Sequence, residues 1–141
     1  GGGGGGTSGG GGAGGNSPGG GGSGTNRSGY IDATKAAAYS VGEVSGSNVY
    51  FGGGGAGGGD PRNGANSSTG GIGGGGNQSP YGSTGANSYT GNGAGGSGVV
   101  WFKLSSFFGV TVGAGLTYET WADGGDNVYL FTAGTDTVTI G

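Results

Sequence analysis

The sequence predicts a mostly non-helical fold that combines a bundle of polyglycine helices with a small antiparallel all-β part at the C-terminal end. Two observations carry this prediction. Glycine accounts for 48 of the 141 residues and recurs in near-continuous runs, most plainly at residues 52–59 (GGGGAGGG). The composition then changes abruptly at Val99, where β-branched and aromatic residues begin. We therefore expect a glycine-rich scaffold over residues 1–98 and a β-strand segment over residues 99–141.

The glycine runs lie at residues 1–6, 9–15, 19–22, 52–59 and 70–76. Such a composition is typical of flexible linkers. The alternative is the extended, threefold polyglycine II helix, which is similar to polyproline II and has no internal hydrogen bonds. Ordering a residue costs about 1–2 kcal/mol, whereas a net hydrogen bond returns only about 0.5–1.5 kcal/mol. A stable bundle of such helices therefore needs a hydrogen-bond partner for nearly every amide.

Connecting loops are predicted between the runs, because proline, asparagine, aspartate and serine gather there with glycine. The three loops span about residues 25–51, 60–69 and 77–90. Within the runs, only glycine allows backbones to approach closely, which is the steric reason that collagen has glycine on its axis.

The first loop holds the only helix-prone piece, residues 31–39 (IDATKAAAY). Asp32 or Thr34 is the candidate N-cap of this helix. Two helical turns alone are marginal, so an irregular segment is the alternative. Residues 48–51 (NVYF) predict a short strand that leads into the next glycine run.

Tyrosines stand among Ser, Asn, Thr and Gly in these loops, which is the composition of antibody paratopes. One interpretation is a recognition surface for a glycan or a protein. The other is that the tyrosines pack over the edges of the glycine bundle and hold the loops down. The candidate recognition residues are Tyr30, Tyr39, Tyr50, Arg62, Tyr81 and Tyr89.

The C-terminal part predicts an all-β structure of four or five strands. The expected strands are residues 99–104, 107–112, 116–121, 128–132 and 135–140. Residues 123–127 (DGGDN) predict a turn, and Ala133-Gly134 predicts a hairpin between the last two strands. So short a segment forms a small core, and we expect it to complete that core against the glycine bundle or another chain.

Few chemical sites are compatible with this composition. Histidine and cysteine are absent, which excludes a His general base, a Cys nucleophile and Cys/His zinc sites. Asp123, Asp126 and Asn127 are oxygen ligands at calcium-like spacing, but an ordinary hairpin turn explains them better. Trp101 and Trp121 are expected to anchor the β core, with a sugar-stacking platform as the alternative. We expect no catalytic residue and no cofactor.

The charge and the hydropathy of the chain limit the kinds of partner that we expect. The net charge is −3, with only 4 basic and 7 acidic residues, which argues against nucleic acid as a partner. No apolar run approaches 18 residues, so we expect no insertion into a membrane.

The segment GAGGSGVVWFKL (residues 93–104), which follows glycine runs, resembles the close of the glycine-rich domain of tailed-phage tail-fibre and minor tail proteins. VYLFTAGTDTVTIG (residues 128–141) is similar to the segment that opens that domain, although here it stands at the C-terminal end. The runs and loops also resemble phage tip adhesins, in which a sandwich of polyglycine helices displays receptor-binding loops.

This resemblance implies a non-enzymatic fibre or adhesin unit, extracellular or on a virion surface, that presents its loops to a host glycan or outer-membrane protein. Residues 128–141 would then suit a repeating array, or strand addition to a neighbouring subunit. A second hypothesis is a self-assembling extracellular filament subunit, held by inter-chain polyglycine hydrogen bonds or strand exchange. Both imply a homo-oligomer or polymer. A weaker third hypothesis is an ice-binding protein, against which the irregular loops argue.

Overall fold

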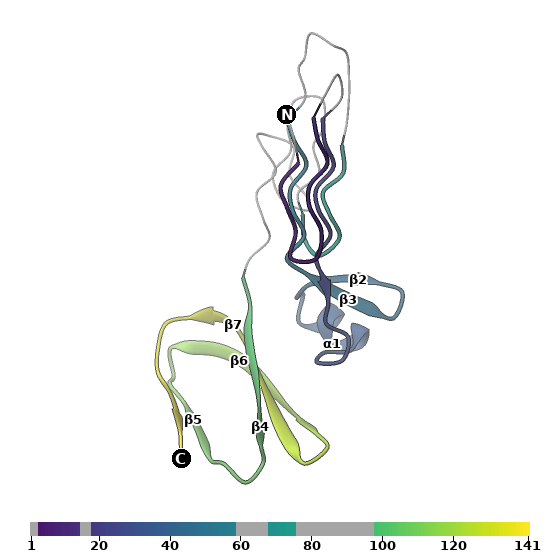
Figure 1. Ribbon diagram of the computed structural model, residues 1–141. Helices are drawn as coiled ribbons and strands as arrows, with labels where there is room; N and C mark the ends of the chain where they lie inside the picture. Colours follow the sequence, from purple (N-terminus) through teal and green to yellow (C-terminus); the bar gives the residue numbers. More distant parts are fainter. Residues whose placement is uncertain (1–2, 15–17, 59–67, 76–97) are drawn as a thin grey trace. The chain divides into compact units, whose positions relative to one another are not determined.

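The computed structural model describes residues 3–14, 18–58, 68–75 and 98–141. It divides into two compact units, Gly1–Gly96 and Ser97–Gly141, which we call the glycine unit and the β unit (Figure 1). Within the described residues the fold is mostly non-helical and has small antiparallel sheets, as the sequence predicts. Each unit is described by itself.

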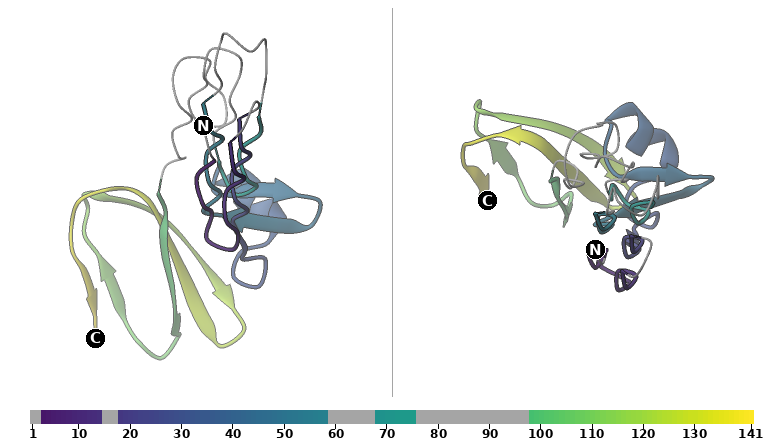
Figure 2. Two further views of the ribbon diagram at one scale, coloured as in Figure 1. Left: turned by 45° about the horizontal axis from the view of Figure 1, so that its top comes forward. Right: turned by 90° about the horizontal axis from the view of Figure 1, so that it is seen from above.

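Five glycine runs form the elongated part of the glycine unit and lie side by side (Figures 1 and 2). In chain order, the first to the fifth run span residues 3–7, 9–14, 18–24, 52–58 and 68–75, and the fifth run ends in a turn at residues 72–74. Backbone hydrogen bonds of 2.7–3.1 Å join the runs to one another. The runs are therefore held mainly by their backbones, with the Ser8 hydroxyl donating to Ser23 O and Gly24 O as a side-chain contact.

The hydrogen bonds of these runs repeat every three residues. Two residues that stand three apart in one run donate to the same neighbouring run. The pairs of donors are Gly3 and Gly6, Gly4 and Thr7, Gly21 and Gly24, and Gly54 and Gly57. A β-strand would repeat every two residues instead.

The third run has more neighbours than a strand in a sheet, which has at most two. It is hydrogen-bonded to all four other runs. Its Gly22 N–H donates to the first run and its Gly21 N–H donates to the fifth. It accepts hydrogen bonds from Gly12 of the second run and Gly54 of the fourth. The runs are therefore stacked in a bundle and do not form a flat layer.

The close approach of backbones explains why glycine is required at some positions and not at others. A Cβ at Gly21 would overlap the carbonyl oxygen of Gly54, whereas a Cβ at Gly20 would lie 3.6 Å from its nearest neighbour. At Gly10 there is nothing within 4 Å, and three residues later stands Ala13, whose methyl group is exposed. The larger residue therefore stands on the open face of its run.

Residues 25–51, which we call the inserted segment, are folded. They hold β1 (Thr25–Asn26), α1 (Ala33–Ala38), β2 (Glu43–Ser45) and β3 (Asn48–Phe51), and the antiparallel sheet has the order β1-β3-β2. The loop predicted here is an ordered segment with its own sheet, and four of its apolar side chains are buried. They are Ile31, Ala36, Val41 and Val49. The helix and the short strand predicted within this stretch are confirmed.

The helix α1 ends in a Schellman motif. Val41 N–H donates to Ala36 O (3.0 Å) and Ser40 N–H donates to Ala37 O (3.3 Å). Ser40 has a φ of 54°, in the left-handed region that glycine usually occupies at this position. The chain turns sharply there and returns Val41 to the buried side of the segment.

The β unit contains five strands in residues 98–141: β4 (Val100–Ser105), β5 (Val110–Val112), β6 (Leu116–Asp123), β7 (Asp126–Gly134) and β8 (Val138–Ile140). One antiparallel sheet has the order β4-β7-β6, and β5 pairs with β8 in a second, two-stranded sheet. On the central strand β7, Val128 and Leu130 are 2% and 1% exposed. The core of this unit therefore lies along β7.

The strand pairing corrects two predictions for the β unit. The predicted hairpin between residues 128–132 and 135–140 is wrong, since β7 already has β4 and β6 on its two edges. The hairpin is formed by β6 and β7 around Gly124 and Gly125, where Asp123 pairs with Asp126 and Gly124 has a φ of 66°. The predicted strand at residues 107–112 shortens to β5, because a turn precedes Gly109.

Candidate functional site

The loop between β1 and α1 is held in one conformation by its own side chains. The Asn26 side-chain oxygen accepts hydrogen bonds from the backbone N–H (2.9 Å) and the hydroxyl (2.6 Å) of Ser28. The Ser28 Oγ in turn accepts from the Val49 N–H at 2.9 Å. This Asx turn fixes the loop to β3, so the side chains that it carries are presented in a defined geometry.

Arg27 and Tyr30 are the side chains that this loop displays. The Arg27 guanidinium carbon lies 5.9 Å from the centre of the Tyr30 ring, within the range of a cation–π contact. Tyr30 is 52% exposed, and its N–H donates to Arg27 O at 2.9 Å. A planar cation next to an exposed phenol suits recognition of a ligand that has both hydroxyl and anionic groups.

The helix α1 follows this loop in the chain and has a capped N-terminus. Asp32 caps the helix by accepting from Lys35 N–H at 2.8 Å, and it forms an ion pair of 2.6 Å with Lys35 Nζ. The side-chain hydrogen bond from Lys35 lowers the pKa of Asp32 below its usual value of 3.8. Of the two candidate caps, Asp32 is therefore the one that the structure uses.

Two contacts connect the inserted segment with the glycine runs. The Thr7 hydroxyl donates to Phe51 O and accepts from Thr25 N–H, both at 3.0 Å. The Glu43 carboxylate accepts from the N–H groups of Gly73 (2.8 Å) and Gly74 (3.1 Å). Both edge strands of its sheet are thus attached to glycine runs: β1 to the first run and β2 to the fifth.

The candidate recognition residues have different locations. Tyr30 lies in the displayed loop, Tyr50 lies on the central strand β3 beside Glu43, and Tyr39 is the C-cap of α1. Arg62, Tyr81 and Tyr89 lie outside the described residues. Arg27 is not among the residues predicted from the sequence, although Asn26 and Ser28 on either side of it form the pattern of an Asx turn, which indicates a fixed loop.

Two of the three calcium candidates of the β unit, Asp123 and Asp126, form ion pairs with a lysine. Lys103 Nζ lies 2.8 Å from Asp123 Oδ2 and 3.4 Å from Asp126 Oδ2. The side-chain hydrogen bond to Asp123 raises the pKa of Lys103 above its usual value of 10.5. Within the described ranges, no group of three Asp, Glu, His or Cys side chains could hold a metal ion. The ammonium group supplies the positive charge that these two carboxylates require.

No family model, curated protein or solved structure matches this chain. In the part of the chain that the structure describes, no helix is long and apolar enough to cross a membrane.

Proposed function

We propose that this chain is a non-enzymatic structural and adhesive unit of the phage-fibre type. Its glycine runs are polyglycine II helices that form a stiff scaffold, and the inserted segment is the recognition element mounted on it. The unit acts outside cells or on a virion surface and binds a glycan or protein of a host surface. The observation that carries this proposal is the fixed, exposed pair of Arg27 and Tyr30 on a segment bounded by glycine runs.

The period of the backbone hydrogen bonds supports the polyglycine II scaffold. A threefold helix directs every third amide to the same side, and the donors three residues apart in the first, third and fourth runs follow that rule. A threefold helix can also have more than two neighbours, as the third run does. A crystal structure with φ near −75° and ψ near +145° along the runs, outside Gly52, Gly73 and Gly74 with their positive φ, would test the assignment.

The contrast between the scaffold and the inserted segment supports the recognition role. The runs offer almost no side chains, so they have little with which to select a ligand. The inserted segment carries Arg27, Tyr30 and Lys35 within a few residues, on a loop and a helix with defined geometry. Fixed loops on a rigid scaffold are the usual arrangement of recognition sites.

Binding of the purified chain to a glycan array and to bacterial outer-membrane preparations tests the proposal. Arg27→Ala and Tyr30→Ser are each expected to weaken binding about 10-fold or more, as interface Arg and Tyr residues commonly do. The matched control is Ser45→Ala on the exposed strand β2, which is expected to leave binding unchanged. Binding that neither Arg27→Ala nor Tyr30→Ser alters would overturn the recognition role.

A further inference from the structure

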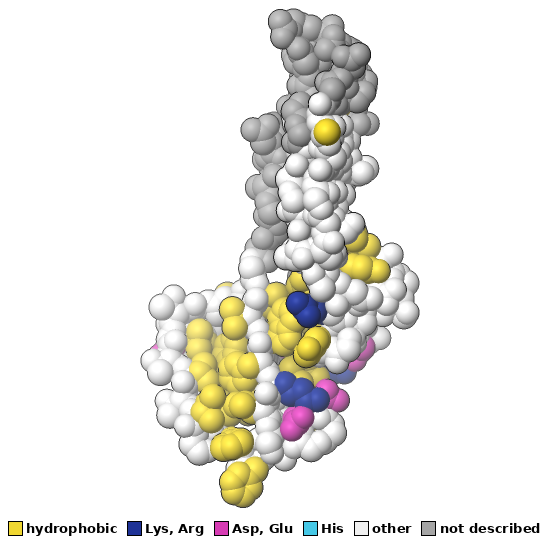
Figure 3. All heavy atoms as spheres, viewed as in Figure 1, with side chains coloured by type: hydrophobic (Ala, Val, Ile, Leu, Met, Phe, Trp, Pro, Cys, Tyr) yellow, Lys and Arg dark blue, Asp and Glu magenta, His cyan; other side chains and the backbone are white. Residues whose placement is uncertain are grey.

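The β unit leaves much of its apolar surface exposed. Figure 3 shows hydrophobic side chains gathered over this part of the molecule. Its exposed large apolar residues are Val100, Phe107, Phe108, Tyr118 and Ile140. A soluble chain rarely exposes contiguous apolar area without a partner for it. Two features of this unit, a protruding tip and a cavity, are both apolar.

The tip consists of Phe107 and Phe108 in the turn between β4 and β5. Phe107 is 89% exposed and Phe108 is 46% exposed. Their rings meet edge to face, with centroids 5.8 Å apart. The turn is anchored, because Phe108 N–H donates to Ser105 O at 3.0 Å and Ser106 N–H donates to Gly125 O at 3.0 Å. The two rings are therefore held together in a fixed, protruding arrangement.

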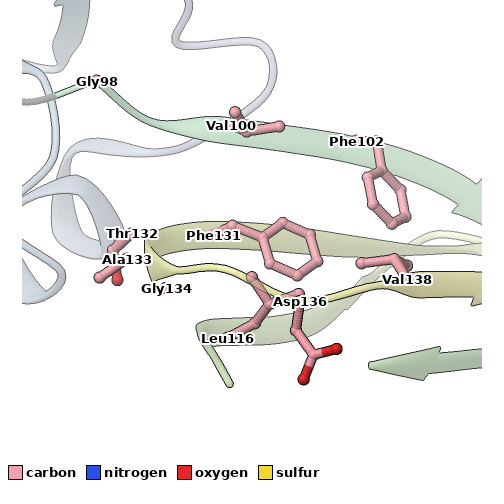
Figure 4. Close-up of a pocket in the computed structure, with 10 residues that line it drawn as sticks. All are labelled: Gly98, Val100, Phe102, Leu116, Phe131, Thr132, Ala133, Gly134, Asp136 and Val138. Carbon is pink, nitrogen blue, oxygen red and sulfur yellow. The ribbon is translucent and has the colours of Figure 1, made fainter. Parts of the chain in front are cut away.

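The cavity has a volume of about 370 Å³ and lies between the three-stranded sheet and the chain that leads into β8. In Figure 4 the side chains of Phe102, Phe131, Leu116 and Val138 point toward one common space. Asp136 is the only ionisable residue in its lining, and its two carboxylate oxygens already accept from the N–H groups of Gly115 and Thr137. An apolar occupant therefore fits this cavity better than a charged one.

The tip follows the last residue of β4, whereas the cavity begins at its first residue. Val100 and Phe102 line the cavity, and Ser105 holds the tip. The three steps from Phe102 to Ser105 span roughly 10 Å. The strand is fixed in its sheet by β7, so the tip of one copy cannot fold back into its own cavity. It can enter only the cavity of another copy.

We propose that Phe107 and Phe108 of one copy insert into the apolar cavity of a second copy, so that the chain associates head to tail. The two rings are apolar and preorganised, and the cavity is in the size range of sites that hold a ligand of several rings. Because the two surfaces differ, each copy keeps a free tip or a free cavity after it has bound. Such a heterologous contact produces a closed ring if the rotation between copies closes, and an open filament if it does not.

Sedimentation velocity of the full chain over a concentration series tests this association. Wild-type chain is expected to form oligomers that lengthen with concentration. Phe107→Ser combined with Phe108→Ser, and separately Val100→Lys at the rim of the cavity, are each expected to weaken association about 10-fold or more. Phe107 and Val100 are 89% and 65% exposed, so these changes leave the fold intact, which circular dichroism checks. The control Val44→Ser removes an apolar side chain of the glycine unit that is 40% exposed, and it should change nothing.

A mixing experiment distinguishes head-to-tail contact from a symmetric one. The tip variant keeps its cavity and the Val100→Lys variant keeps its tip, so an equimolar mixture is expected to form 1:1 dimers that grow no further. A photo-crosslinking residue at position 107 should attach to the cavity residues of the other copy. A chain that stays monomeric at about 1 mM, a tip variant that associates like wild type, or cross-links outside the cavity would each overturn the proposal.

Discussion

The glycine unit and the β unit are stabilised in opposite ways. In the glycine runs the backbones contact one another directly, and the hydrogen bonds between runs are the main attractive contacts. In the β unit the backbone only positions side chains, and Val128, Leu130 and a stack of aromatic rings fill the interior and one face. An added methyl group should therefore damage the first unit, whereas a removed side chain should damage the second.

Two measurements report on the units separately. Both tryptophans, Trp101 and Trp121, belong to the β unit, so indole fluorescence follows its unfolding. Hydrogen exchange of the glycine amides follows the runs.

The largest effect is expected from Gly21→Ala in the third run. The new methyl group would overlap the carbonyl oxygen of Gly54, so the runs must separate and their shared hydrogen bonds break. We expect a loss of more than about 4 kcal/mol in the unfolding free energy of the glycine unit, seen as lost amide protection. Gly20→Ala is the matched control: its methyl group has room, and the change is expected to stabilise by about 0.4–1 kcal/mol. Equal effects of the two variants would contradict backbone packing.

The converse substitution in the β unit is Leu130→Ala. Leu130 is 1% exposed on the central strand, and removing its side chain should cost about 2–5 kcal/mol. Urea unfolding followed by tryptophan fluorescence measures this loss. Thr139→Ala on the exposed face of β8 is the control and is expected to change stability by less than about 0.5 kcal/mol. If the control were as destabilising as Leu130→Ala, the core would not lie along β7.

A smaller, stabilising effect is expected from Ser40→Gly after α1. Ser40 has a φ of 54°, a conformation that costs a non-glycine residue about 1 kcal/mol. The glycine variant should gain roughly that amount, measured by amide exchange of Ala36 and Val49. Ser45→Gly in β2, where the backbone is extended, should lose about 0.5–1 kcal/mol instead. A gain in both variants would exclude relief of strain at Ser40 as the cause, because glycine at an unstrained position is expected to destabilise.

The smallest effect is expected in the pH dependence of the stability of the β unit. Hydrogen bonds from the N–H groups of Gly115 and then Thr137 lower the pKa of Asp136 below its usual value of 3.8. The Asp136 carboxylate therefore binds a proton more readily in the unfolded chain than in the folded one, so the ionised carboxylate stabilises the fold. This stabilisation is fully present above about pH 3.8 and is lost as the pH falls through the lower pKa of the folded state. Asp136→Asn should be less stable than wild type near pH 6, and the difference should shrink in acid. Fluorescence-detected urea unfolding at several pH values measures it; a constant difference would exclude Asp136 as its source.

The sequence predicts the local structure of several elements well. Asp32 followed by an alanine-rich stretch predicts α1, because capping and helix propensity act within a few residues. The alternating and β-branched residues predict the strands β4, β6 and β7 for the same reason. The Arg27 and Tyr30 site was only half predicted, since the tyrosine is recognisable by composition but the fixed loop depends on Ser28 bonding to β3.

By itself, then, the sequence determined the mostly non-helical fold, the shift of composition at Val99 and the positions of most strands. Only the tertiary structure decided which strands pair: β7 has β4 and β6 as neighbours, and β8 pairs with β5. It also decided which glycines are indispensable. Gly20 and Gly21 are indistinguishable within their run of glycines, and they differ only because the backbone of Gly54, 33 positions further along the chain, approaches one of them. Local propensity cannot encode such a contact, because its cause is a neighbour that only folding brings near.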